Sequence, residues 1–158
     1  MIKSTLFFQL LSIGYLATCS SVSAGQPTVK ELVAAPEKIT IEGRSLLIET
    51  ELWRDFMPSS PPDGRPLIAA IKLKTIDNTN LPKGIEVVSV WIVNDDKLWS
   101  PTKKEALKGD SNSSMTISVR DGPKWGPGID VDVIVELKDS QNQSHLLRAS
   151  KQPIGKTF

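Results

Sequence analysis

The apolar and polar side chains of residues 129–137 (IDVDVIVEL) alternate at every position except Ile134, and this is the clearest structural signal in the sequence. Five apolar residues occupy every second position, whereas Asp130, Asp132 and Glu136 lie between them. Successive side chains of a β-strand point to opposite faces, so this period predicts a strand with one buried and one polar face. We expect Val133, in the middle of the apolar set, to lie at the centre of a core.

Similar patterns recur along the chain and predict seven or eight short strands. The expected strands are residues 38–41, 45–56, 66–75, 85–93, 115–119, 129–137 and 146–149, with a short edge strand near 97–100. The last two long strands form a hairpin across the polar turn 139–144. Residues 85–93 are apolar at both parities, so both faces of that strand need cover and we expect it to be central. The only helical candidate is residues 101–108 (PTKKEALK), with Pro101 near its start.

Short strands of this number, with Trp91 on the third long strand and a closing hairpin, resemble the immunoglobulin-like and fibronectin type III-like domains. The resemblance covers residues 38–158 and lies in the strand pattern, because the cysteine pair of antibody domains is absent. It implies an all-β fold: a single immunoglobulin-like β-sandwich of about seven to eight mostly antiparallel strands, with at most one short helix. This fold hosts many unrelated functions, so the resemblance implies no ligand or partner.

The first 24 residues have the pattern of an export signal. Lys3 precedes the apolar residues 6–17, a stretch too short to span a bilayer. Val22-Ser23-Ala24 places small residues where a signal peptidase cleaves, which predicts a signal peptide at residues 1–24. The predicted location of the protein is therefore the periplasm or the outside of the cell.

A second interpretation of the same segment makes the protein a lipoprotein. Residues 16–19 resemble a bacterial lipobox in which Cys19 would carry the lipid, but Thr18 departs from the small residue usual before that cysteine. Lipidation would anchor the protein to a bacterial membrane, and only in that case do we expect a membrane partner. Cys19 is the only cysteine, so no internal disulfide can form in either case and stability must come from the core.

The rest of the chain divides into a leader at residues 25–37 and one domain at residues 38–158. The leader has no convincing period, and we interpret it as a tether or a loosely docked first strand. Without the signal peptide the chain carries 18 basic and 18 acidic residues. Nucleic acid and anionic membranes require clustered Lys and Arg, so this balance argues against both as partners.

The sequence offers little catalytic chemistry. His145 is the sole histidine, and no Gly-x-Ser-x-Gly motif surrounds any serine. A zinc site needs several His or Cys ligands, which this chain lacks. Asp95, Asp96, Asp110 and Asp121 could gather around calcium, but Asp is also a common turn residue and the turn interpretation is preferred. We therefore predict no enzymatic activity, no catalytic residue, no metal and no cofactor.

Three tryptophans are the candidate binding residues: Trp53, Trp99 and Trp125. Tryptophans on loops dominate binding hot spots and stack on sugars, although they also plug the ends of β-domains. Residues 51–66 (ELWRDFMPSSPPDGRP) form a stiff connector whose Phe56 shares the parity of the core positions. Trp53 has the opposite parity, and we expect the proline-rich loop to fold back over it.

Three classes of function stay open on this inventory. The leading one is a non-enzymatic extracytoplasmic binding or accessory module that meets another protein through a sheet edge or its loops. The alternative is a carbohydrate-binding module that uses the loop tryptophans as a platform for a polysaccharide. A small hydrolase or enzyme inhibitor is the least favoured class.

The cleavage-site pattern makes a first prediction, that the exported protein begins at Gly25. Intact-mass spectrometry of the protein recovered from the producing cells measures this directly. A diacylglycerol-modified Cys19 at the N-terminus would show instead that the protein is a lipoprotein.

Overall fold

The computed structural model describes residues 25–102, 104–108 and 112–158, and in this part the chain is mostly β with one short helix. The predicted signal peptide and Cys19 lie outside the described residues, as does Asp110. The described part contains helix α1 (Val29–Val33) and the strands β1 (Ile39–Ile41), β2 (Arg44–Asp55), β3 (Leu67–Thr75), β4 (Glu86–Asn94), β5 (Lys97–Trp99), β6 (Lys104–Lys108), β7 (Ser114–Gly122), β8 (Asp130–Lys138) and β9 (Ser144–Thr157). Within these residues no helix has both the length and the apolar character needed to cross a membrane.

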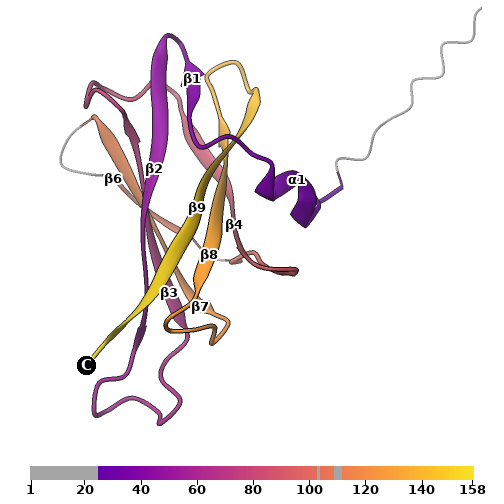
Figure 1. Ribbon diagram of the computed structural model, residues 1–158. Helices are drawn as coiled ribbons and strands as arrows, with labels where there is room; N and C mark the ends of the chain where they lie inside the picture. Colours follow the sequence, from indigo (N-terminus) through magenta and orange to yellow (C-terminus); the bar gives the residue numbers. More distant parts are fainter. Residues whose placement is uncertain (1–24, 103, 109–111) are drawn as a thin grey trace, which may run out of the picture.

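The described strands form one curled, mixed sheet in the order β5-β4-β8-β9-β2-β3-β7-β6, with β1 paired to the start of β2 (Figure 1). The pairing is antiparallel except between β2 and β9, which run parallel. β9 pairs with β8 along most of its length and then with β2 at its C-terminal end. The prediction of a mostly antiparallel, all-β chain is confirmed, with nine described strands in place of seven or eight.

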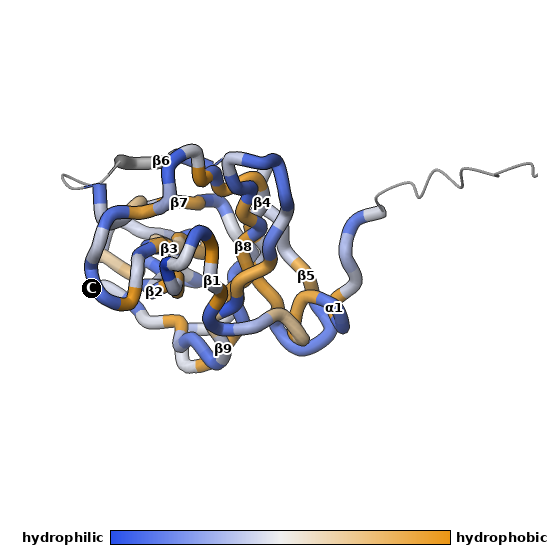
Figure 2. Tube along the Cα trace, turned by 90° about the horizontal axis from the view of Figure 1, so that it is seen from above, coloured by the Kyte–Doolittle hydropathy of each residue, from blue (hydrophilic) through white to orange (hydrophobic). Residues whose placement is uncertain are grey.

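The core fills the inside of the curl, where Figure 2 shows apolar stretches of β3, β4 and β8. Alternate residues of each strand supply it: β3 buries its odd-numbered positions from Leu67 to Thr75, and β8 buries Val131, Val133 and Val135. Val133 is fully buried, as its alternation predicts. The hairpin between β8 and β9 is also confirmed, because Lys138 pairs with Ser144.

Both faces of β4 are covered, as predicted, but β4 is not central. It lies next to the short strand β5 near one end of the sheet. Val90 and Ile92 face the main core, whereas Trp91 and Val93 belong to a second buried cluster on the opposite face. Trp91 is therefore buried, but outside the core that the curled sheet encloses.

Helix α1 covers this second cluster, so the leader is neither a tether nor a strand. Leu32 is fully buried and lies in one cluster with Trp91, Val93 and Ile134. The helix starts at a capping box in which Thr28 Oγ1 accepts a hydrogen bond from Glu31 N and Glu31 Oε2 accepts one from Thr28 N. A single helical turn is marginal by itself, and burial of its apolar face stabilises it here.

The predicted helix at residues 101–108 is wrong, because part of this segment is strand β6. Lys104 to Lys108 pair antiparallel with Val119 to Met115 of β7. Lys, Glu, Ala and Leu favour helices as isolated residues, but the ladder with β7 gives the backbone of this segment a different set of partners.

The second cluster makes α1 a structural element, and Leu32→Ala tests its contribution. We expect a loss of about 2–4 kcal/mol in the free energy of unfolding, because the side chain is removed from a fully packed site. Urea denaturation measures the loss. Lys30→Ala, at an exposed position of the same helix, is the control and should change stability by less than about 0.5 kcal/mol. Equal effects of the two substitutions would show that α1 is not packed on the sheet.

Candidate functional site

Two of the three candidate tryptophans take part in core packing. Trp99 and Trp125 are partly buried and pack against the main core. The Trp99 ring lies on Gly122 so closely that a Cβ at that glycine would be 2.9 Å from two ring atoms. The structure therefore gives both residues a packing role and does not join them to Trp53 in one platform.

Trp53 is different, because it packs against neither buried cluster although it is partly buried. It lies on the outer face of the sheet, opposite Ile68 of β3 on one side and Gly155 of β9 on the other. Of the three candidate tryptophans, Trp53 is therefore the one to which core packing assigns no structural role.

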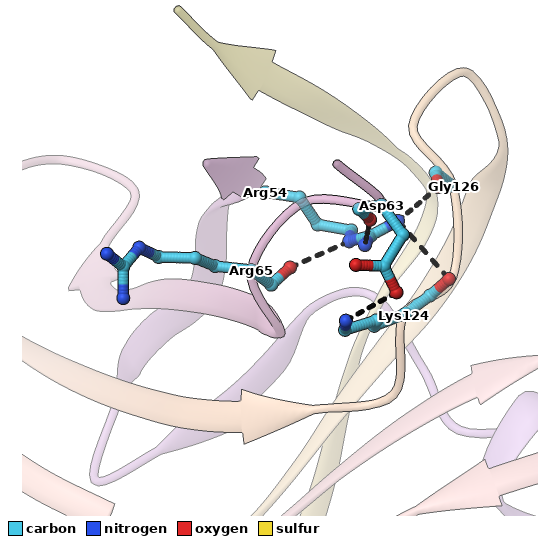
Figure 3. A network of polar contacts seen from close by, with 5 residues as sticks. All are labelled: Arg54, Asp63, Arg65, Lys124 and Gly126. Atoms are coloured by element: carbon cyan, nitrogen blue, oxygen red, sulfur yellow. Dashed lines mark hydrogen bonds and ion pairs between the residues drawn. The ribbon is translucent and has the colours of Figure 1, made fainter. Parts of the chain in front are cut away.

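The proline-rich stretch after Trp53 is organised by Arg54, whose side chain is only 3% exposed. Its guanidinium donates to the carbonyl oxygens of Arg65 (2.9 Å), Gly126 (2.7 Å) and Lys124 (3.3 Å), and also to that of Asp63 (Figure 3). These acceptors come from two loops, residues 56–66 between β2 and β3 and residues 123–129 between β7 and β8. A planar guanidinium with five N–H donors can join both loops at once.

The loop after β2 packs on Phe56, which corrects the expectation that it covers Trp53. Gly64 lies so close to the Phe56 ring that a Cβ there would be 2.6 Å from the nearest ring atom. Its φ of +74° also favours glycine. The Arg54 guanidinium lies 5.1 Å from the centre of the same ring. These contacts lie on the face of β2 opposite Trp53.

We call the two loops joined by Arg54, together with the C-terminal residues 156–158, the braced end. Phe56 N donates to Thr157 O (2.9 Å), so the chain terminus runs beside the first loop. Lys124 Nζ donates to Asp63 Oδ2 (2.6 Å), and this bond lowers the pKa of the Asp63 carboxyl. Met57 and Phe158 are among the exposed large apolar residues, at 43% and 75%. The braced end thus combines fixed loops with exposed apolar side chains.

His145 lies at the far end of the sheet, in the β8–β9 hairpin. Its Nε2 is 3.0 Å from Asp139 Oδ2, and Asp139 Oδ1 accepts from the backbone N–H groups of Gln141 and Gln143. The hydrogen bond with His145 is the main reason why the pKa of Asp139 is lowered. The Asp139–His145 pair thus stabilises the turn between β8 and β9. Across the residues described, no three His, Cys, Asp or Glu side chains are grouped as metal ligands.

The sequence interpretation missed Arg54, although the signal was present. Leu46, Ile48, Leu52 and Phe56 share one parity, and Arg54 lies at the same parity between two of them. A strand position flanked by buried neighbours on its own face is itself an inward position. An arginine there must find hydrogen-bond acceptors inside the protein.

No protein-family model matches this chain, and no curated protein matches it either.

Arg54→Met is the direct test of the brace. We expect the free energy of unfolding to fall by about 3 kcal/mol or more, because several carbonyl groups lose a charged donor together. Proteolysis within residues 56–66 should also become faster. Arg65→Met is the matched control, since the Arg65 side chain is exposed and makes only surface contacts, an ion pair with Asp55 and a hydrogen bond to Ser60 Oγ. Its cost should stay below about 1 kcal/mol, and an equal cost would contradict the role of Arg54.

Proposed function

We propose that the described chain is an immunoglobulin-like β-sandwich. Its strand order supports this: β6-β7-β3-β2 runs as the D-E-B-A sheet of such domains, and β5-β4-β8-β9 runs as the C′-C-F-G sheet. The parallel pairing of β2 with the end of β9 joins the first and last strands of this scheme. The curled sheet then corresponds to two layers that share the main core.

We further propose that the protein is a non-enzymatic, extracytoplasmic binding module that meets a protein partner at the braced end. The observation that carries this proposal is the buried guanidinium of Arg54, which joins two loops that lie far apart in the sequence. Loops that are already ordered lose less conformational entropy when they bind, so a rigid loop pair favours recognition. The extracytoplasmic location rests on the signal-peptide pattern of residues 1–24.

The exposed side chains of the braced end suit a protein partner. Met57 and Phe158 are apolar and solvent-accessible, and the Lys156 ammonium lies 4.4 Å from the centre of the Phe158 ring. The same end carries ion pairs between Asp55 and Arg65 and between Asp63 and Lys124. Apolar anchors with a polar rim are the usual composition of a protein interface.

The sheet edges are less suited to binding than the loops. β5 has three residues and β6 has five, both short for strand addition. On β4, the carbonyl oxygen of Val90 accepts a hydrogen bond from Ser100 Oγ at 3.2 Å, and that of Val88 accepts one from Lys104 Nζ. Side chains thus occupy acceptors that an added strand would need.

Site-specific photocrosslinking tests the proposal in the cells that produce the protein. A photoreactive amino acid replaces Met57 in one variant and Glu49, on the outer face of β2, in the control. We expect the Met57 variant to form one protease-sensitive adduct of defined mass and the Glu49 variant to form none. Phe158→Asp combined with the Met57 probe should reduce that adduct at least about tenfold, since a charge replaces an apolar anchor. Equal labelling at both positions, or no adduct at position 57, would argue against a protein partner at this end.

A further inference from the structure

Outside the braced end, one surface carries an unexplained group of side chains: the outward face of β2, β3 and β7, here called the outer face. Glu49, Glu51 and Trp53 point outward from β2, opposite Lys72, Ala70 and Ile68 of β3. Thr116 and Ser118 continue the same two rows on β7, opposite Lys72 and Ala70. The cross-strand row next to Trp53 consists of Glu51, Ala70 and Ser118, and the small side chain at its centre is that of Ala70.

The outer face is hollowed next to the β2 residues that precede Trp53. A shallow depression of about 370 Å³ is lined by Glu49, Thr50, Glu51, Ala70, Lys72 and Thr116. Ala70 forms the floor, between Glu51 on one side and Ser118 on the other. Trp53 does not line the depression itself, but it lies two residues beyond Glu51 on the same face of β2, about 7 Å further along the strand.

The indole of Trp53 is partly buried, but neither buried cluster accounts for its position. The other three tryptophans belong to or pack against a buried cluster, and Trp53 does neither. Its neighbour on β9 is Gly155, and a Cβ there would meet only Leu52 O, at 3.7 Å. Apart from its chain neighbours Ile154 and Lys156, no described residue places a side chain within 4 Å of that point, so the position on β9 opposite Trp53 is open.

The polar groups of the depression are also available in part. Glu49 forms an ion pair with Lys74, which orients this carboxylate at the rim. Lys72 and Glu51 make no ion pair with any residue that the structure describes. An ammonium donor, a carboxylate acceptor and the Thr116 hydroxyl thus surround a small apolar floor next to an aromatic ring.

We propose that this depression binds an uncharged oligosaccharide, with Trp53 as the stacking platform for one sugar ring. A sugar ring has an apolar C–H face that packs on an indole and a perimeter of hydroxyl groups that both donate and accept. Glu51 accepts from hydroxyls, Lys72 donates to them, and Ala70 leaves room for the ring. Acidic and basic side chains are balanced on the outer face, which favours a neutral ligand over a charged one.

Isothermal titration of the purified protein with cellopentaose, maltopentaose and chitotetraose tests this site. We expect saturable binding of at least one of them. Trp53→Ala removes the platform, and Ala70→Gln fills the floor while the indole stays in place. Each substitution should weaken binding at least about tenfold.

Phe158→Ala removes an exposed aromatic at the braced end, so this matched control should bind sugar as the unchanged protein does. Thermal melts and two-dimensional NMR spectra of all variants separate loss of the site from loss of the fold. In the folded protein, the indole N–H signal of Trp53 should shift on titration, and the signals of Trp99 and Trp125 should stay in place. Absence of binding to all three oligosaccharides overturns the proposal, and so does undiminished binding in either folded outer-face variant.

Discussion

The hydrogen-bonded seam along β9 is the constraint on which the rest of the structure depends. β9 pairs antiparallel with β8 from Ser144 to Pro153 and then parallel with β2 from Ile154 to Thr157. Shortly before the change of partner, where the β8–β9 register shifts, Lys151 has a positive φ of 52° and its N–H donates to Asp132 Oδ1 at 2.9 Å. Asp132 also binds Arg148, so this outward carboxylate fixes the bend and is more than a solvated surface residue. Because one strand joins both parts of the curl, the strands on either side can share one continuous core.

Alternation predicted most of this architecture because one-sided burial leaves a period of two in the sequence. The eight expected strands are all present, and the fully buried Val133 lies where its pattern places it. The prediction of secondary structure failed where strand pairing leaves no alternation in the sequence. Residues 104–108 have helical composition, yet their partner is a strand that follows them in the chain. The last part of β9 carries Lys151, Pro153 and Gly155, which weaken any strand pattern, and its pairing with β2 is a long-range property.

The sequence of β4 is apolar on both faces, which predicts that both are buried but does not show which element buries the second one. That element is α1, which is too short to show a helical period in the sequence of the leader. Its local signal was the pair Thr28 and Glu31, three residues apart in a capping box.

At the candidate sites the sequence predicted the face of a side chain but not the contacts of a loop. Trp53 was assigned correctly to the outward face, but the loop expected to cover it packs on Phe56 and Arg54. Parity assigns a side chain to a face, whereas loop contacts depend on acceptors that only the folded chain brings together.

The acceptors of Arg54 have a consequence for how this protein can change over generations. All four are main-chain carbonyl groups, which every amino acid possesses, so the brace does not depend on the side chains of the loops it holds. Apart from Phe56 and Gly64, which pack on one another, the residues of the first loop contribute no side chain to the hydrogen bonds of Arg54. A frame of this kind separates shape from surface chemistry. It lets the specificity of one end diversify without a matching cost in folding, and it makes the same two loops suitable positions for grafting foreign recognition sequences.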